Sequence, residues 1–275
     1  MRCLSKEKEY VFHSILVDVK HYAEVESTQS LLREIYHEKL LHNDKVESNR
    51  VAVVSADHQW SGRGKGDRVW FSSAAFKCLA MSFLFPFPMD LTASAPFITQ
   101  LLALSAVDAL KTLGVADACV KWPNDIVLKG RKVGGILAEM FPLCSGFHAI
   151  IVGIGMNIDV PEDVLDANVG RYRVWPPGAI EQLVGVEISP EKLRENLIEQ
   201  FLLNLLEFLK EKKPAGFFLP RVNAYQILLG SHISFKITDS ETVEGVHKGV
   251  SSDGGLLIET AGIERVYYSG EIVFK

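Results

Sequence analysis

The segment at residues 62–70 constrains the fold of this chain more than any other. It reads GRGKGDRVW, so Gly62, Gly64 and Gly66 alternate with charged residues, and it follows an apolar run at residues 51–56. Glycine permits backbone conformations and close approaches that a Cβ would block, so such a loop can arrange N–H groups and cations around a phosphate or carboxylate. The apolar run predicts a buried strand, and ligand loops commonly leave the ends of core strands. We therefore expect an anion-binding loop, with a surface loop that binds nothing as the alternative.

Three more motifs follow along the chain. They are KWPND at 121–125, GRKVGGIL at 130–137 and GIGMN at 153–157, an order that is hard to obtain by chance. The formal net charge is −5, yet basic residues gather around the motifs, at Arg63, Lys65, Arg68, Lys121, Lys129, Arg131 and Lys132. Local positive charge on an acidic protein favours a small anionic ligand over DNA or RNA, whose binding requires many neutralised phosphates. We expect no nucleic-acid partner.

The hydrophobic pattern predicts an α+β fold. Strands are expected at 9–19, 51–56 and 79–85, with an antiparallel meander of short strands at 119–158. Helices are expected directly after Ser27 and Thr28, at 95–113, and from Ser189-Pro190 to about residue 212. From about residue 229 the strands become short and alternating, which indicates a small β-barrel or sandwich. The prediction is a mixed, largely antiparallel sheet flanked by helices, with domains at 1–225 and 226–275.

The chain has the features of a soluble cytoplasmic protein. Charges cluster at its start, where a secretory signal needs an apolar core, and charge or proline interrupts each apolar stretch before it reaches bilayer length, so we expect no membrane association. The four cysteines, Cys3, Cys78, Cys119 and Cys144, form no close CxxC pair, which favours buried free thiols over a disulfide or a zinc site.

The motifs together resemble those of the biotin protein ligase (biotin–acetyl-CoA-carboxylase ligase) family, from Glu26 to the C-terminus. The matched landmarks are 26–29 (ESTQ), Gln59, 62–64 (GRG), Trp70, 121–125, 132–137, 153–157 and Gly270-Glu271. The resemblance implies a class II synthetase-like catalytic domain with an SH3-like C-terminal barrel, and it implies ATP and Mg2+ as cofactors. It also implies two reactions: the carboxylate of biotin attacks the α-phosphate of ATP to give biotinyl-AMP, and a lysine of the biotin carboxyl carrier protein of acetyl-CoA carboxylase then takes the biotinyl group.

The resemblance also implies roles for particular residues. Lys132 would stabilise the charge that builds up during adenylation, Arg63 would hold the carboxylate and later the acyl phosphate, and Lys65 would assist as a second cation. Substrate-binding residues would be Ser27, Thr28, Gln59, Gly62, Arg63, Gly64, Trp70, Lys132, Gly134 and Gly135. Nucleotide-binding residues would be Lys65, Arg68, Asn124 and Asn157, and the magnesium ligand would be Asp125.

Each role has a plainer alternative. Lys132 can be a solvated turn lysine, Ser27 or Thr28 a helix cap, each asparagine a turn residue, and Trp122 a core residue. Many family members have arginine where this chain has Lys65, and Asp67-Arg68 also departs from the usual pattern. Two interpretations of Asp67 stay open: its charge weakens retention of the negative intermediate, or its side chain points to water.

Other functions were weighed against the ligase. A lipoate ligase or octanoyl transferase shares the fold class, but Trp122-Pro123 and the GRG segment at 62–64 favour biotin. A repressor would need a DNA-binding domain, and about 23 residues before the first motif helix are too few for one. Lys132 and Asp125 argue against a biotin-binding module without catalysis. A self-pairing sheet edge within 119–158 would make a homodimer.

Overall fold

The computed structural model describes residues 4–42, 47–66, 68–143, 146–167, 175–210, 214–238 and 240–273. The chain divides into two compact units. The first unit comprises residues 1–92, 133–169 and 178–194, and the second comprises 93–132, 170–177 and 195–275. These units do not test the domain boundary that we expect after residue 225, which stays a prediction.

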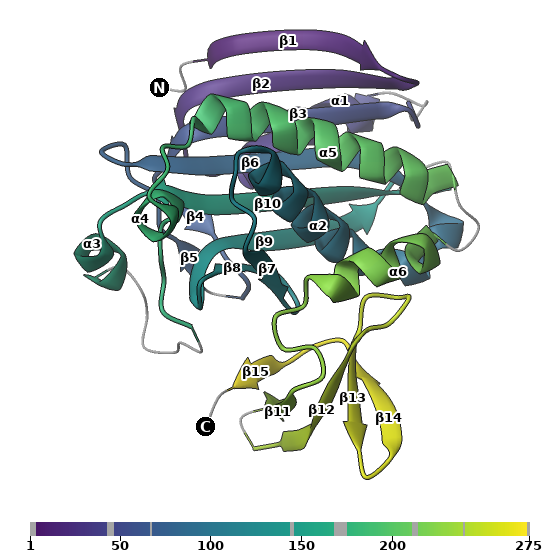
Figure 1. Cartoon of the computed structure of the whole chain (residues 1–275). Helices are drawn as coiled ribbons and strands as arrows, with labels where there is room; N and C mark the ends of the chain where they lie inside the picture. Colours follow the sequence, from purple (N-terminus) through teal and green to yellow (C-terminus); the bar gives the residue numbers. More distant parts are fainter. Residues whose placement is uncertain are drawn as a thin grey trace. The chain divides into compact units, whose positions relative to one another are not determined.

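The first unit is built on a mixed, largely antiparallel sheet, as the sequence predicts. Its strands lie in the order β1 (Leu4–Phe12), β2 (Ile15–Val25), β3 (Arg50–Gln59), β6 (Lys77–Pro88), β10 (Phe147–Asp159) and β9 (Arg131–Pro142) (Figure 1). The first two residues of β9, Arg131 and Lys132, belong to the second unit. Only the β2–β3 pair among these described strands is parallel. Successive side chains of a strand point to opposite faces, so each strand supplies residues to both sides of the sheet.

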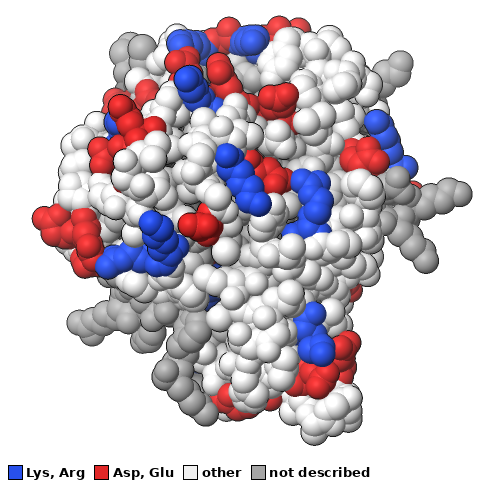
Figure 2. Space-filling view, viewed as in Figure 1, with Lys and Arg blue, Asp and Glu red and all other residues white. Residues whose placement is uncertain are grey.

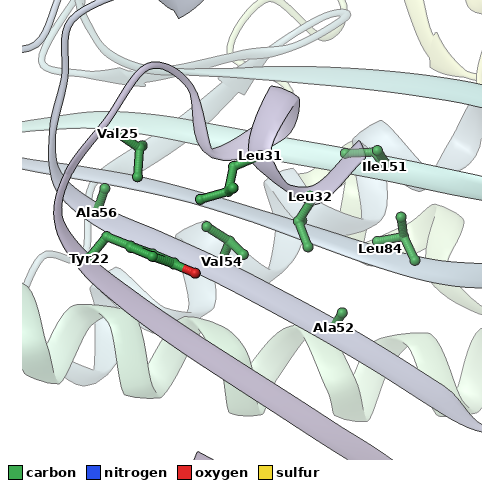
Figure 3. Packing of buried hydrophobic residues seen from close by; sticks show 9 residues of the cluster. All are labelled: Tyr22, Val25, Leu31, Leu32, Ala52, Val54, Ala56, Leu84 and Ile151. Carbon is green, nitrogen blue, oxygen red and sulfur yellow. The ribbon is translucent and has the colours of Figure 1, made fainter. Parts of the chain in front are cut away.

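Helix α1 (Thr28–His42) covers one face of this sheet. Its Leu31 and Leu32 lie against Val54 of β3, Leu84 of β6 and Ile151 of β10, as Figure 3 shows. All of these side chains are buried, and full burial of each leucine contributes about 1.5–3 kcal/mol. This packing fixes the start of α1 beside the last residues of β2 and β3.

The glycine-rich segment folds back on itself. Strand β4 (Gly62–Arg63) pairs antiparallel with β5 (Val69–Trp70), with Gly62 opposite Trp70 and Arg63 opposite Val69. We call residues 62–70 the glycine hairpin. Gly66 has a φ of 67° at its turn, in the left-handed region that glycine adopts without strain. Asp67 lies outside the described residues.

The second unit contains helices, a pair of strands and a five-stranded sheet. It contains α2 (Phe97–Thr112), the antiparallel pair β7 (Ala118–Lys121) and β8 (Asp125–Leu128), the part of α5 (Pro190–Lys210) from residue 195, and α6 (Pro214–Ala224). A five-stranded antiparallel sheet follows in the order β14 (Ile263–Tyr267), β13 (Leu256–Thr260), β12 (Thr242–Val250), β11 (His232–Lys236) and β15 (Glu271–Val273). It is open rather than a closed barrel and remains compatible with an SH3-like arrangement.

Aromatic rings form much of the core of the second unit. Phe97 of α2 stacks on Phe208 of α5 with ring centroids 5.8 Å apart, and Phe208 contacts Phe218 of α6. Trp122 packs against Phe235 of β11 and is 1% exposed. The plainer expectation for Trp122, core packing, is therefore confirmed.

Several elements differ from the sequence prediction. A single strand was expected at 9–19, but β1 and β2 form a hairpin that turns at His13, whose φ is 53°. The turn escapes detection because it contains neither glycine nor proline. Helix α6, strand β12 and the short elements η1 (Met89–Ser94), α3 (Glu162–Ala167) and α4 (Ile180–Val184) were not predicted. Ser189 caps α5 as expected, its Oγ accepting a hydrogen bond from the Lys192 N–H.

Cys78 is a buried free thiol and Cys119 a partly exposed one. Burial raises the pKa of Cys78 to about 11. Cys3 and Cys144 lie outside the described residues. Within the described ranges, no helix has the length and apolar character needed to cross a bilayer.

Candidate active site

A buried polar cluster lies at the start of α1. The Thr28 N–H donates to Gln59 Oε1 at 2.7 Å, and the Thr28 hydroxyl donates to the same oxygen at 3.1 Å. The hydroxyls of Thr28 and Ser82 lie 2.8 Å apart. Ser82 was not predicted, although a hydroxyl within the otherwise apolar strand β6 was a usable signal. The structure thus brings predicted Thr28 and Gln59 together with Ser82.

Ser27 has a different local role. Its Oγ accepts a hydrogen bond of 3.4 Å from the Ser30 N–H, which is the geometry of a helix cap at the first turn of α1. Of the two adjacent hydroxyls, Ser27 caps the helix and Thr28 joins the polar cluster. A contact of Ser27 with substrate stays a prediction.

Glycines of β10 leave room on the face of the sheet beside this cluster, because they carry no side chain. A Cβ on Gly153 would lie 2.7 Å from Ser82 Oγ, and a Cβ on Gly155 would overlap the indole of Trp70. Gly155 pairs with Gly135 of β9, and Gly134 pairs with Met156. A Cβ on Gly62 would lie 2.6 Å from the Trp70 carbonyl oxygen. The glycines therefore let Trp70 and the glycine hairpin approach the sheet.

Arg63 is engaged by a carboxylate of the protein itself. Its Nη1 and Nη2 donate to Glu139 Oε2 and Oε1, both at 2.9 Å. Gln29 Nε2 donates to Oε2 at 2.9 Å, and Arg33 Nη2 lies 3.3 Å from Oε1. We call Gln29, Arg33, Arg63 and Glu139 the Glu139 cluster. No role was predicted for Glu139 or Gln29, since nothing local marks a residue of β9 as the partner of a loop arginine.

The other cations of the glycine hairpin are exposed. Lys65 and Arg68 both lie on its surface. The N–H of Gly64 donates to the Arg68 carbonyl at 2.8 Å, which holds the two arms of the hairpin together. The nucleotide-binding roles of Lys65 and Arg68 stay predictions.

Lys132 follows a tight turn in the second unit. Lys129 and Gly130 have φ values of 47° and 74°, as in a two-residue turn of type I′ between strands. The Lys132 N–H donates to the Pro176 carbonyl at 2.8 Å, which fixes the backbone at this point. Its Nζ lies 2.5 Å from Asp125 Oδ1. The lysine is therefore held at both backbone and side chain, unlike a solvated turn lysine.

Asp125 pairs with a second ammonium group as well. Lys121 Nζ lies 3.5 Å from Asp125 Oδ2, and the Lys121 side chain is 4% exposed. Burial alone would raise the pKa of the Asp125 carboxyl, but the charges of Lys132 and Lys121 outweigh it and lower this pKa. Asp125 is thus a carboxylate that pairs with two lysines.

This arrangement does not fit a resident magnesium ion. Both oxygens of Asp125 face ammonium groups, which repel a second cation. Nowhere in the described part of the chain do three or more His, Cys, Asp or Glu side chains gather to hold a metal. A metal-binding role for Asp125 stays a prediction, and no step proposed below depends on it.

Both predicted asparagines lie where a structural role is open to them. Asn124 lies in the turn between β7 and β8, after the cis Trp122-Pro123 bond. Trp122 Nε1 donates to the Gly254 carbonyl at 3.0 Å. Asn157 is buried, and its Nδ2 donates to the Gly178 carbonyl at 3.1 Å. Their roles toward nucleotide stay predictions.

Comparisons with known proteins identify the family of this chain. The Biotin/lipoate A/B protein ligase family matches residues 23–157, and the Biotin protein ligase C terminal domain matches residues 228–275. The chain belongs to the biotin protein ligase family.

Individual relatives match over most of the chain. The bifunctional ligase/repressor BirA of Bacillus subtilis (strain 168) is 28% identical over 85% of this chain and 71% of its own length. The biotin–[acetyl-CoA-carboxylase] ligase of Paracoccus denitrificans is 28% identical over 81% of this chain and 90% of its own. A mutant biotin protein ligase from Aquifex aeolicus, solved in complex with biotin, is 25% identical with a TM-score of 0.68, covering 92% of this chain and 96% of that one.

Proposed function

We propose that this protein is an ATP-dependent biotin protein ligase. It activates biotin as biotinyl-5′-AMP. It then transfers the biotinyl group to the amine of a lysine of a biotin carboxyl carrier protein, as the bond from the acyl carbon to the phosphate oxygen breaks and AMP leaves. The observation that carries the proposal is the ion pair of Lys132 with Asp125, because it holds a compact cation in place within a motif of the matched family.

The chemistry of adenylation requires fixed positive charge. A biotin carboxylate oxygen bonds to the α-phosphorus of ATP, and the bond from that phosphorus to the bridging oxygen breaks to release pyrophosphate. Both reactants are anions, so cations that are ordered before the reaction lower the barrier without reorganising during it. We assign Lys132 to the charge that develops at the α-phosphate and Arg63 to the carboxylate and then the acyl phosphate.

The polar cluster favours biotin over lipoate. The ureido ring of biotin offers N–H donors and a carbonyl acceptor, which match the hydroxyl and amide groups of Thr28, Gln59 and Ser82. The dithiolane ring of lipoate offers no comparable groups, and burying polar side chains against it would leave hydrogen bonds unmade.

The partners we propose follow from the same assignment. ATP enters with magnesium as its substrate complex, and the acceptor is the carrier of acetyl-CoA carboxylase, the enzyme named in the Paracoccus denitrificans relative. A cytoplasmic location suits these partners. On the face drawn in Figure 2, described Lys and Arg side chains lie beside Asp and Glu, which offers no extended basic surface for a polyanion there. Homodimer formation stays a prediction.

A direct assay tests the proposal. The purified protein is incubated with MgATP, a biotin carrier domain and either biotin or lipoate, and the carrier is weighed by mass spectrometry. We expect the biotinyl adduct, and none on a carrier whose acceptor lysine is replaced by arginine. Lipoyl transfer without biotinyl transfer would assign the chain to the other branch of the family.

A further inference from the structure

We propose that Glu139 is a positioning residue that holds Arg63 in the ligand-free protein and releases it to the anion of the substrate. The inference rests on the proposed function, because the anion concerned is the carboxylate of biotin and then the acyl phosphate of the intermediate. It gives a role to a residue of β9 that the catalytic assignment leaves unused.

The contact is built like the recognition of a substrate carboxylate. Both terminal nitrogens of Arg63 donate to Glu139, one to each oxygen at 2.9 Å, in the paired arrangement that makes Arg–carboxylate contacts strong and directional. Arg63 and Glu139 are 76 residues apart in sequence, and their side chains are 41% and 21% exposed. The pair therefore ties the glycine hairpin to β9 at a place that ligand can reach.

The substrate and Glu139 compete for the same end of the guanidinium group. A carboxylate that binds Arg63 through both terminal nitrogens must displace Glu139, since two carboxylates on one edge would repel each other. Binding is then an exchange of one anion for another, with no unpaired arginine before or after.

The rest of the cluster keeps the released carboxylate satisfied. After Arg63 leaves, Glu139 retains Gln29 Nε2 at 2.9 Å and Arg33 Nη2 at 3.3 Å. Leaving a partly buried carboxylate without a partner is costly, so these two contacts lower the free energy needed to open the pair. Arg33 also lies over the ring of Phe141, which holds it near Glu139.

Two substitutions change how strongly Glu139 holds Arg63, in opposite directions. Glu139→Gln keeps the shape of the side chain but removes its charge, which weakens the hold on Arg63. Arg33→Gln removes the other cation from Glu139, which strengthens that hold. Glu187→Gln is the matched control, since it removes a carboxylate from an exposed ion pair with Lys77 in the same unit.

Hydrogen exchange of peptides covering β4 and β5, and the Kd for biotin, are measured for each protein. For Glu139→Gln we expect faster hydrogen exchange without ligand and hydrogen exchange equal to that of the wild type with biotin and ATP. We also expect a Kd for biotin about three- to tenfold lower, which corresponds to a binding free energy about 0.7–1.4 kcal/mol more favourable. For Arg33→Gln we expect the opposite change in Kd, and for Glu187→Gln no change.

Two results would overturn the proposal. Unchanged exchange in ligand-free Glu139→Gln would show that the pair does not hold the hairpin, and a raised Kd would show that Glu139 stays on Arg63 in the complex. The exchange measurement without ligand does not depend on the reaction. If the wild type fails to bind biotin, the proposed function fails, while that measurement still reports on the Arg63–Glu139 pair.

Discussion

The Nζ atom of Lys132 lies 2.5 Å from Oδ1 of Asp125, whose other oxygen faces Lys121 at 3.5 Å. Two ammonium groups thus share one carboxylate that is 13% exposed, and the three side chains together keep a net positive charge. The pair restricts the rotation of a long side chain before any ligand arrives, which reduces the entropy lost on forming a reactive complex.

Replacing Lys132 by alanine should abolish adenylation. Without the ammonium group, no fixed cation stabilises the negative charge that builds at the α-phosphate. We therefore expect the rate of biotin-dependent ATP–pyrophosphate exchange to fall by at least about 100-fold. Lys248→Ala, in an exposed ion pair with Glu259, serves as the control and should retain wild-type exchange. Normal exchange in a folded Lys132→Ala protein would remove Lys132 from the mechanism.

Replacing Asp125 by asparagine should destabilise the protein in a pH-dependent way. The loss leaves buried Lys121 without its carboxylate, and we expect the free energy of unfolding to fall by about 3 kcal/mol at pH 7. The pKa of Asp125 is lowered in the folded state, so its contribution is present above the unfolded pKa and is lost as pH falls through the folded value. Urea unfolding of both proteins should therefore show a difference that shrinks below about pH 4. A difference that is constant down to pH 3 would contradict the ion pair.

Two glycine substitutions should have opposite effects. A methyl group on Gly155 would overlap the Trp70 indole, so Gly155→Ala should displace that ring, cost about 1–3 kcal/mol of stability and weaken biotin binding more than about tenfold. Gly216→Ala places its methyl in open space within helix α6 and should stabilise by about 0.5–1 kcal/mol. Calorimetry and biotin titration of both variants provide the measurements, and equal biotin affinities would argue against a role for Trp70 near substrate.

Removal of the Ser27 hydroxyl and removal of the Thr28 hydroxyl should have different effects on stability and on biotin binding. Ser27→Ala removes a helix cap, and we expect a loss of about 1 kcal/mol in unfolding free energy. Thr28→Val removes the hydroxyl that joins Gln59 and Ser82, so the Kd for biotin should rise more in this variant than in Ser27→Ala. The reverse order of the two Kd values would place Ser27 rather than Thr28 against the substrate.

Cys78 should resist alkylation. With a pKa of about 11, only about 0.1% of this thiol is ionised at pH 8, and the side chain is buried. Cys119 is partly exposed and should react with iodoacetamide before Cys78 does, as peptide mapping by mass spectrometry would show. Faster labelling of Cys78 would mean that its strand opens readily.

The elements that the sequence predicted well are those with strong local signals. Helix α5 follows its Ser189 cap and ends at Lys210, close to the predicted limit, because capping and apolar periodicity act within a few residues. The turn before Lys132 was also predicted, since Gly130 marks a backbone conformation that few other residues adopt. The extra turn at His13 and helix α6 carry weaker signals, and tertiary packing decided them.

The amino-acid sequence specifies which chemical groups are present and their order along the chain: the glycine-rich segment at 62–70, the KWPND segment at 121–125 and Lys132. Which of these groups come into contact depends on how the strands pair in the folded protein. Ser82 lies beside Thr28 although 54 residues separate them, and Glu139 lies beside Arg63 although 76 residues separate them; no local pattern shows that these residues meet. Strand order and register set these contacts, because a shift of one residue along a strand would turn each side chain to the other face of the sheet.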